Sequence, residues 1–416
     1  MASAELQREE KSEEDNVEER GDGFSDISDS EFLHLDDLMM ESAQSQGEAE
    51  SNKRSYETHQ SQGELQDTSE TANTENSSPS TELSEGSKPS VEQGKDTAGK
   101  NQRKRKPDAR NPLERYHLKY LCVTDLCSQA WCEQQMVYGM DMPEIMEIQD
   151  ILQPERAALM DTGASIHLAR ELEVHDIVSV STKTREDSWA IKFLNLLSMV
   201  SVLQAGGPVR EFPVFGEIEG IFLVGVIDEL HYTPKGELEL NELKTRGHPS
   251  LPGRAQKRKY HLQVQVYKLI FDAMVRGQMN LGNLIGHLGL NPEQPLGTQV
   301  REHVQSAGLT VNCFGDLLEL TCLNLTFSDL PNIDRLRLEY HYQGDSSLIG
   351  AEMVRFEGSD VKEQLGGYIA YWKGQREPKG VDIEEAWKCQ SCGYAEICEW
   401  REKRGTVISH AKKAKQ

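Results

Sequence analysis

The centre of the chain reads PVFGEIEGIFLVGVIDEL at residues 213–230, followed after a turn at Gly236 by ELELNELKTR at residues 237–246. Its apolar residues come in short alternating runs that turn residues interrupt, which is typical of hairpin strands. We therefore predict three adjacent strands at the centre of the domain.

Helical patterns lie on both sides of these strands. One helix is predicted at residues 161–173, with Asp161 or Thr162 as its N-cap, and another at residues 261–275. The order helix, strands, helix predicts a mixed α/β core. Outside this core we predict a helix at 123–139, strands within 336–357 and a helix at 359–373. Residues 281–335 carry too many Gly, Pro and Asn residues for an assignment.

Acidic side chains gather at the ends of two of these strands. Glu242 and Lys244 are two residues apart, so they face the same side of their strand, and Asp228 is predicted to end the strand before it. Two carboxylates beside a lysine form a hard-oxygen site for Mg²⁺ or Mn²⁺, which would activate water at a phosphodiester. Lys244 would orient that water.

The acid-x-Lys spacing is common, and its context decides its value. The chain repeats it at residues 9–11, 360–362 and 377–379, none of which follows an apolar strand with an aspartate upstream. His167, near the start of the predicted helix 161–173, and Gln263 with Tyr267, four apart on one helix face, would in isolation be ordinary packed residues. Only their order with the carboxylates indicates a site.

This order resembles the RecB-like branch of the PD-(D/E)XK nucleases over about 105 residues, on the motifs Gly163-x3-His167, Gly225-x2-Asp228, Glu242-x-Lys244 and Gln263-x3-Tyr267. The resemblance implies a restriction-endonuclease-like α/β core, with a mixed central sheet flanked by helices and with helical insertions. It implies that the metal is held by His167, Asp228, Glu242 and the Leu243 carbonyl, and that the catalytic set is Asp228, Glu242, Lys244, Gln263 and Tyr267.

Three further glutamates lie near this set. We place Glu219 in the turn of the GEIEG hairpin. Glu217 would lie either in that turn or near the metal. Glu171, one helical turn beyond His167, would either support that histidine or face solvent.

Eight cysteines are present, at 122, 127, 132, 313, 322, 389, 392 and 398. The group Cys389-x2-Cys392-x5-Cys398 lacks a fourth ligand nearby, and four thiolates can hold either zinc or a [4Fe–4S] cluster. Cys122, Cys127 and Cys132 are available upstream as the fourth ligand. The upstream cysteines that do not serve as this ligand, together with Cys313 and Cys322, are predicted to be buried free thiols.

RecB-like nucleases with an iron–sulfur cluster place one cysteine before the nuclease motifs and three after them. In their pattern five residues separate Thr-Asp-Leu from the cysteine, which here selects Cys132 after residues 124–126, with Cys127 as the runner-up. The phrases VTDLCSQAWCEQQ, GVIDEL, ELKTR, LQVQVYK and CQSCGYAEICEW are similar to those of the eukaryotic exonuclease V family across residues 115–403. The cluster would then act as a structural clasp between the two ends of the domain.

The resemblance implies a single-strand-specific DNA exonuclease that releases short oligonucleotides from strand ends in DNA repair and genome maintenance. A basic stretch after the catalytic strand fits this substrate, with Arg246, Arg254, Lys257, Arg258 and Lys259 predicted to bind phosphates, and Tyr260 to stack on a base. The alternatives are a related endonuclease or duplex-end-processing nuclease, and a catalytically inactive DNA-binding scaffold.

The charge of the chain is divided unevenly. Residues 1–100 hold 26 acidic and 8 basic residues, a net charge of −18, whereas the remainder holds 43 acidic and 37 basic, a net charge of −6. The low apolar content of the first part predicts disorder. We therefore expect an acidic tail at 1–108, a nuclease domain at 109–403 and a basic tail at 404–416.

Short features of the tail suggest its partners. An apolar stripe at residues 24–39 would dock a single-strand-binding or repair protein, although an inert stretch explains it equally well. The run KNQRKRK at residues 100–106 favours the nucleus, with the cytoplasm as a second location. The polar N-terminus and the lack of a long apolar run predict no membrane association, and we expect a monomer.

Overall fold

The computed structural model describes residues 110–152, 154–173 and 180–403. The acidic tail with its stripe and basic run, and the tail at 404–416, lie outside the described residues. In chain order the elements are α2 (Pro112–Arg115), β1 (Leu121–Cys122), α3 (Val123–Ser128), α4 (Glu133–Asp141), α5 (Pro143–Leu152), α6 (Pro154–Glu171), α7 (Arg185–Gln204), β2 (Val209–Ile218), β3 (Ile221–Tyr232), β4 (Leu238–Arg246), α8 (Arg254–Val275), α9 (Leu281–Leu288), α10 (Thr298–Ser306), α11 (Phe314–Thr326), β5 (Arg335–Tyr342), β6 (Leu348–Val354), α12 (Gly358–Trp372) and the 3₁₀ helix η1 (Ile383–Cys389).

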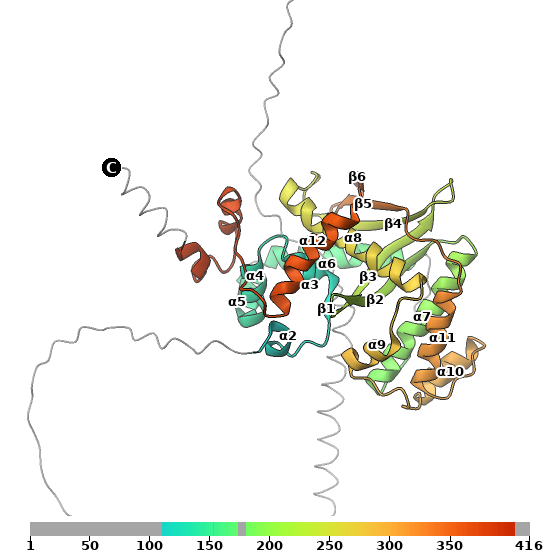
Figure 1. Ribbon diagram of the computed structural model, residues 1–416. Coiled ribbons are helices and arrows are strands. Elements are labelled where there is room, and N and C mark those ends of the chain that lie inside the picture. The colour runs from blue at the N-terminus through green and yellow to red at the C-terminus, as the bar shows by residue number, and fades with distance from the viewer. Residues whose placement is uncertain (1–109, 153, 174–179, 404–416) are drawn as a thin grey trace, which may run out of the picture. The chain divides into compact units, whose positions relative to one another are not determined.

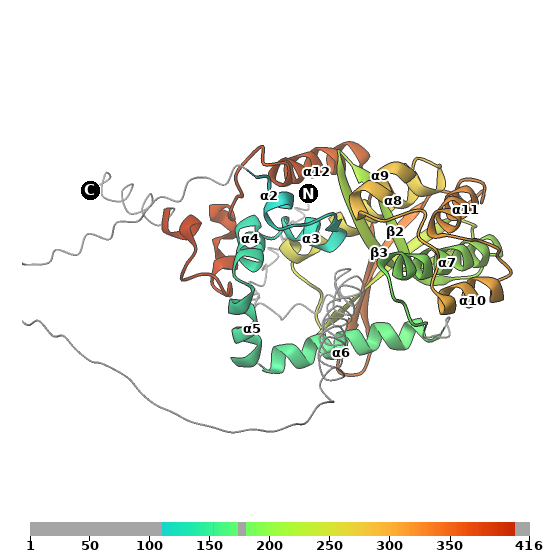
Figure 2. The same ribbon diagram turned by 90° about the horizontal axis from the view of Figure 1, so that it is seen from below.

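A mixed six-stranded sheet forms the centre, in the order β1-β3-β4-β5-β6, with β2 on the other edge of β3. β2/β3, β3/β4 and β5/β6 are antiparallel, whereas β1/β3 and β4/β5 are parallel. The predicted mixed sheet flanked by helices is therefore confirmed. Helices α7, α10 and α11 gather on one side of the sheet, and α3 and α4 lie on the other with the C-terminal segment (Figures 1 and 2).

The core lies mainly between the sheet and α8. This helix has buried residues along its whole length, and its Phe271 packs on Phe212 of β2 with ring centroids 5.5 Å apart. Removing so much apolar surface from water is the main favourable term for this layer. Among the described residues, no helix combines the length and the apolar character that crossing a bilayer requires.

The edge of β3 that faces β4 is interrupted, and this interruption positions the candidate site. β4 pairs with β3 only at residues 229–232, and β1 pairs with it only at residues 223–224. Between them, residues 225–228 have no strand partner on that edge among the described residues. The strands therefore separate at Asp228, which lies inside β3 and not at its end as predicted.

Gly225, the first residue of this interruption, allows α8 to approach the sheet. A Cβ atom at this position would lie 2.6 Å from Cε1 of Tyr267 and 3.0 Å from Cγ2 of Val123. Both distances are too short for carbon atoms, so a side chain here would push α8 and α3 away from the strand. Close packing of α8 and α3 against β3 thus explains why the Gly225-x2-Asp228 motif has a glycine at its first position.

Several helix boundaries differ from prediction. The helix predicted at 123–139 is two helices, because Cys132 is extended (φ −166°, ψ 114°) and serves as the N-cap of α4. Helix α6 begins at Pro154, so Asp161 and Thr162 are interior, and the Thr162 hydroxyl donates to the Ala158 carbonyl at 2.8 Å. Short polar side chains satisfy either role, so the sequence pattern alone does not separate them.

Three other differences concern the central part of the chain. His167 lies near the C-terminal end of α6 and not near its start, because the helix begins earlier than predicted. Helix α8 begins seven residues before the predicted start, directly after Gly253. The unassigned stretch 281–335 contains α9, α10 and α11; Gly297 is the N-cap of α10 and Gly289 the C-cap of α9, but other Gly and Asn residues lie within the helices.

Candidate active site and cysteine pocket

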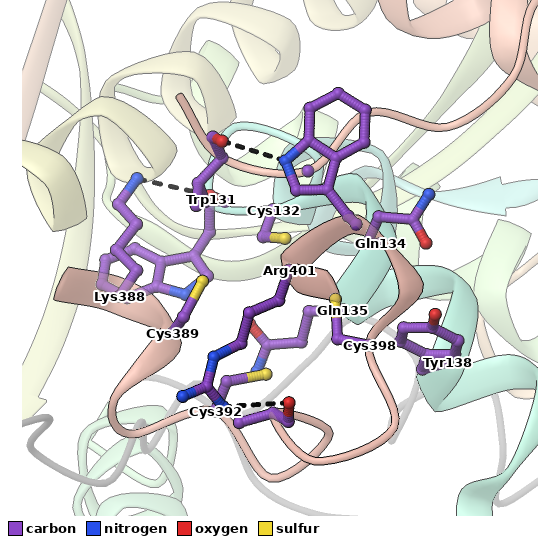
Figure 3. A pocket seen from close by; sticks show the side chains of 14 residues that line it. Trp131, Cys132, Gln134, Gln135, Tyr138, Lys388, Cys389, Cys392, Cys398 and Arg401 are labelled. Carbon is purple, nitrogen blue, oxygen red and sulfur yellow. Dashed lines mark hydrogen bonds between the residues drawn. The ribbon is translucent and has the colours of Figure 1, made fainter. Parts of the chain in front are cut away.

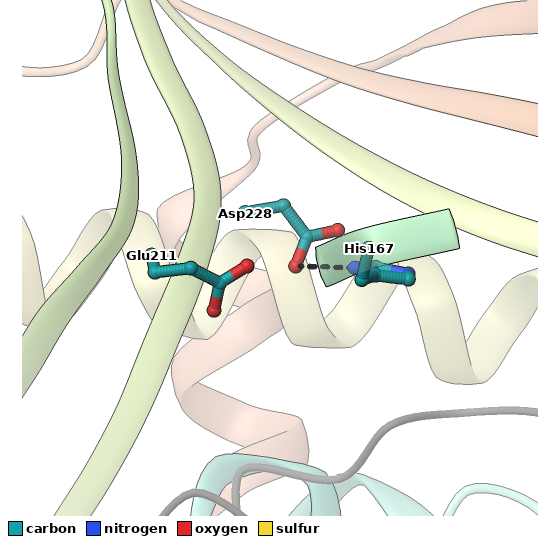
Figure 4. A group of neighbouring side chains, drawn as sticks. All are labelled: His167, Glu211 and Asp228. Atoms are coloured by element: carbon teal, nitrogen blue, oxygen red, sulfur yellow. Dashed lines mark ion pairs between the residues drawn. The ribbon is translucent and has the colours of Figure 1, made fainter. Parts of the chain in front are cut away.

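Three side chains form a group that can hold a metal ion. Ligand atoms of His167, Glu211 and Asp228 all lie within 4.8 Å of one another, and His167 Nδ1 is 3.8 Å from Asp228 Oδ1. The side chains come from α6, β2 and β3 and point toward one another (Figure 4). One imidazole and two carboxylates are a ligand set that divalent ions such as Mn²⁺ and Mg²⁺ accept.

Glu211 is the functional candidate that the sequence analysis missed. It lies on β2 opposite Asp228, between the paired residues Arg210 and Phe212, and has a left-handed backbone conformation with φ 55°. A residue other than glycine seldom adopts this conformation, which costs of the order of 1 kcal/mol or more and occurs at turns and at functional sites. The only available sequence signal was a glutamate directly before an apolar strand, which is too common to single out.

Asp228 also connects this group to β4. Its Oδ2 accepts a hydrogen bond of 2.7 Å from the backbone N–H of Leu243, across the gap where the strands separate. Leu243 lines the same small pocket as His167, Glu211 and Asp228. The hydrogen bond satisfies a backbone donor that has lost its ladder partner, and it orients the carboxylate so that Oδ1 faces His167.

The other predicted catalytic residues form a second group, between β4 and α8. Glu242 Oε1 lies 3.2 Å from Lys244 Nζ and accepts a hydrogen bond of 2.9 Å from Gln263 Nε2. The same amide donates to the Tyr267 hydroxyl at 3.0 Å, and all four side chains are buried. Glu242 and Lys244 thus project together as predicted, and Gln263 joins them to Tyr267.

The structure therefore divides the predicted metal ligands. His167 and Asp228 lie in the first group with Glu211, whereas Glu242 lies in the second, and Leu243 stands between them. The two groups are nevertheless linked. His167 contacts Asp228, and Asp228 accepts a hydrogen bond from the N–H of Leu243, which stands between Glu242 and Lys244 in β4.

Tyr260 does not have the surface position predicted for it. Its side chain is buried, and its ring lies beneath Lys244, with Nζ 5.0 Å from the ring centroid. A ring in this position cannot stack on a DNA base, because the lysine occupies its face. It instead forms a cation–π contact that helps to hold Lys244.

The predicted phosphate-binding residues lie at the end of β4 (Arg246) and along the first turns of α8. Arg254 and Arg258 are exposed, and Arg258 forms an ion pair with Glu385. Lys257 Nζ lies 2.9 Å from Glu352, and Arg246 is buried and donates to Gln256. The strip thus exists, but several of its cations have partners within the chain.

The three other glutamates have defined positions. Glu219 lies in the two-residue turn with Gly220, both at positive φ, which confirms its predicted place. Glu217 accepts a hydrogen bond from Asn283 at 2.6 Å, so it supports α9. Glu171 lines the pocket that contains His167.

A second pocket collects four cysteines from both ends of the described domain. Cys132, Cys389, Cys392 and Cys398 line it together with Trp131 and Lys388, and their sulfur atoms surround a common space (Figure 3). Cys127 does not line this pocket; it is fully buried in the hydrophobic core next to α8. Cys122 is buried as predicted, whereas Cys313 and Cys322 are only partly buried.

The chemistry of these thiols fits a bound cation. Burial, together with the neighbouring Cys392 and Cys389, raises the pKa of Cys132 to about 11, although backbone hydrogen bonds partly lower it. Burial also raises the pKa of Cys389 and of Cys392. Four thiolates crowded together repel one another, and a metal centre that binds them offsets this repulsion.

Hydrogen bonds also join the two chain segments around this pocket. The Glu133 carboxylate, directly after Cys132, accepts two hydrogen bonds from the Arg376 guanidinium and one of 2.7 Å from the backbone N–H of Lys379. Gln134 donates to the Pro378 carbonyl at 3.0 Å. The pocket is therefore held in place on both sides by bonds other than those to a metal.

Comparisons with known proteins identify the class. The sequence model described as "Exonuclease V - a 5' deoxyribonuclease" matches residues 111–241, 233–319 and 309–401. An "Exonuclease V" from Danio rerio is 48% identical over 297 residues, which cover 71% of this chain and 74% of that protein. The chain is thus a DNA exonuclease, an enzyme that hydrolyses phosphodiester bonds.

More specifically, the chain belongs to the exonuclease V family. The resemblance to the exonuclease V family seen in the sequence is confirmed. An "Uncharacterized protein ORF95" from Ostreid herpesvirus 1 is 28% identical over 123 residues, covering 27% of this chain and 40% of that protein. A solved structure described as "Crystal structure of SSO0001" covers 68% of this chain and 87% of its own, with 13% identity and a TM-score of 0.32, too low to carry an argument.

Proposed function

We propose that this enzyme is a metal-dependent, single-strand-specific DNA exonuclease of the PD-(D/E)XK type that releases short oligonucleotides from strand ends in DNA repair and genome maintenance. One observation carries this proposal. The metal-binding group at Asp228 is joined through the Leu243 N–H to the strand segment that presents Glu242 and Lys244. The carboxylates of Glu211 and Asp228 are thus linked to Glu242 and Lys244 at a break in the sheet.

His167, Glu211, Asp228 and the Leu243 carbonyl would hold Mg²⁺ or Mn²⁺, and Glu242 would join them when substrate and water complete the site. Such an ion polarises the phosphoryl group and lowers the pKa of bound water. Lys244, held by Glu242 and the Tyr260 ring, would orient the attacking water. Gln263 of α8 donates hydrogen bonds to Glu242 on β4 and to the Tyr267 hydroxyl on α8, and so holds these two side chains in place.

We also propose a [4Fe–4S] cluster in the cysteine pocket. The four cysteines would supply its thiolates, since this number matches the usual ligand count of the cluster. Its role is structural: it would join α4 to the segment after α12, and thereby close the domain. Lys388, which is buried and forms a cation–π contact with Trp131 at 4.5 Å, would reduce the negative charge around it.

Substrate ends test the exonuclease proposal. We expect the purified enzyme with Mg²⁺ to degrade linear single strands, to leave covalently closed single-stranded circles and blunt duplexes intact, and to remove a 5′ label before a 3′ label. Denaturing gels of 5′- and 3′-labelled strands measure this, with EDTA as the control for metal dependence. Efficient cutting of circles would instead identify an endonuclease, and release of the 3′ label first would reverse the polarity.

The location in the cell is a separate proposal. The basic run at residues 100–106 supports import into the nucleus, with a second population in the cytoplasm. We expect a tagged chain with Lys and Arg of this run changed to Gln to move largely to the cytoplasm, as fluorescence microscopy would show. An unchanged nuclear signal would contradict the assignment.

The apolar stripe at residues 24–39 is proposed to dock a single-strand-binding or repair protein. The enzyme is proposed to act as a monomer. Loss of co-purification when the stripe is deleted, and the mass in solution, test these two points.

A further inference from the structure

Two arginines line the pocket that holds the candidate metal group. Arg170 lies three residues after His167 on the same face of α6, and Arg210 precedes Glu211 on β2. Neither belongs to the motifs that indicated the active site. The two guanidinium groups share the carboxylate of Glu229, which follows Asp228.

Arg210 serves as a support within this pair. Its Nε donates to Glu229 at 2.8 Å, and Nη1 lies 2.8 Å from Glu173 and also bonds to the backbone carbonyl of Arg170. These contacts tie β2 to the last turn of α6, so they hold the helix that carries His167 against the sheet. The tight geometry leaves Arg210 little freedom to move toward a ligand.

Arg170 is held less tightly and lies nearer to solvent. Its Nη2 is 3.2 Å from Glu229 and its Nη1 is 3.7 Å from Glu339, while 23% of its side chain is exposed. A guanidinium has five N–H donors in a planar fork, more than these two carboxylate contacts use.

The pocket is lined by more carboxylates than cations. Glu171, Glu211, Asp228 and Glu229 line it together with Arg170 and Arg210, and Lys244 is not among its lining residues. A phosphodiester entering the pocket would meet these carboxylates, and Arg170 offers a fork that matches two phosphate oxygens. Resting on the proposed function, we propose that Arg170 is a substrate-binding residue that holds a DNA backbone phosphate beside the metal group.

The salt dependence of DNA binding tests this proposal directly. Each phosphate contact contributes about −0.7 to the slope of log K against log salt for a single strand. We expect Arg170→Gln to reduce the magnitude of that slope by about 0.7 and to weaken binding of a single-stranded oligothymidylate about tenfold. Binding is measured by fluorescence anisotropy with Ca²⁺ in place of Mg²⁺, with product formation checked on the same samples.

A matched control removes the same charge elsewhere. Arg276, at the end of α8, is half-exposed and pairs with Asp272 at 3.8 Å, away from the pocket. We expect Arg276→Gln to bind with the wild-type slope and affinity. If both variants show the wild-type slope, or both lose the same amount, the assignment of Arg170 is overturned.

Two further results separate the possible failures. If Arg170→Gln does not fold, Arg170→Lys carries the test: we expect an unchanged slope with weaker binding, because lysine keeps the charge but lacks the fork. Wild-type affinity of Arg170→Lys would overturn the proposal. If the wild-type enzyme with Mg²⁺ leaves single strands intact, the proposed function fails, which is distinguishable from a wild-type enzyme that degrades DNA and a variant with an unchanged slope.

Discussion

Replacing Asp228 by asparagine is expected to lower the rate of Mg²⁺-dependent DNA degradation by at least about a thousandfold, because a metal-ion contribution of several kcal/mol to the transition state is lost. Asparagine keeps an oxygen that can accept a hydrogen bond from the Leu243 N–H, so the bond that bridges the gap between β3 and β4 is preserved. Alanine would remove that acceptor as well and leave a backbone donor unsatisfied, at a cost of about 1–3 kcal/mol in stability. Asparagine is therefore the cleaner change. Initial rates on end-labelled single strands measure the effect.

The chain supplies its own control for this experiment. Asp360 stands in a second acid-x-Lys sequence, at residues 360–362, but it is exposed in the first turn of α12. We expect Asp360→Asn to leave the rate unchanged. Glu211→Gln, within the metal group, should raise the Mg²⁺ concentration needed for half-maximal rate. Wild-type rates for Asp228→Asn would remove Asp228 from the mechanism, and a wild-type Mg²⁺ requirement for Glu211→Gln would remove Glu211 from the metal group.

Replacing Cys132 by serine is expected to abolish iron retention and to lower the melting temperature by roughly 10 °C. The reason is that Cys132 and Cys389 lie 257 positions apart, so a group that binds both restricts a very long loop of the unfolded chain. Binding of the cluster adds to the free energy of unfolding for the same reason. Iron and sulfide analysis after anaerobic purification, together with thermal denaturation, measures both effects.

Cys127→Ala is the matched control, because Cys127 is five residues upstream and buried in the core away from the pocket. We expect this variant to keep its iron, with only a modest loss of stability from the small cavity. The opposite outcome, iron kept by Cys132→Ser and lost by Cys127→Ala, would reassign the fourth ligand. Zinc in place of iron in the wild-type protein would overturn the cluster itself.

Local pattern was sufficient for much of the fold. The strands around residues 213–246 and the helix near 359–373 appear where the sequence predicts them, since alternation and helical spacing report on burial directly. The helix break at Cys132 was not predictable, because residues 123–139 carry no glycine or proline at the break and tertiary contacts impose it. The start of α6 at Pro154 was not predicted either, because the sequence of this helix shows only weak apolar periodicity.

Residue type and order are enough to indicate the family, the strand that carries Glu242 and Lys244, and the separation of the cysteines into distant groups. Which side chains meet depends on the tertiary structure. It brings Glu211 to Asp228, buries Tyr260 under Lys244 and collects Cys132 in place of Cys127 at the pocket. Such contacts depend on where strands separate and helices break, and these positions are set by packing between segments far apart in the chain.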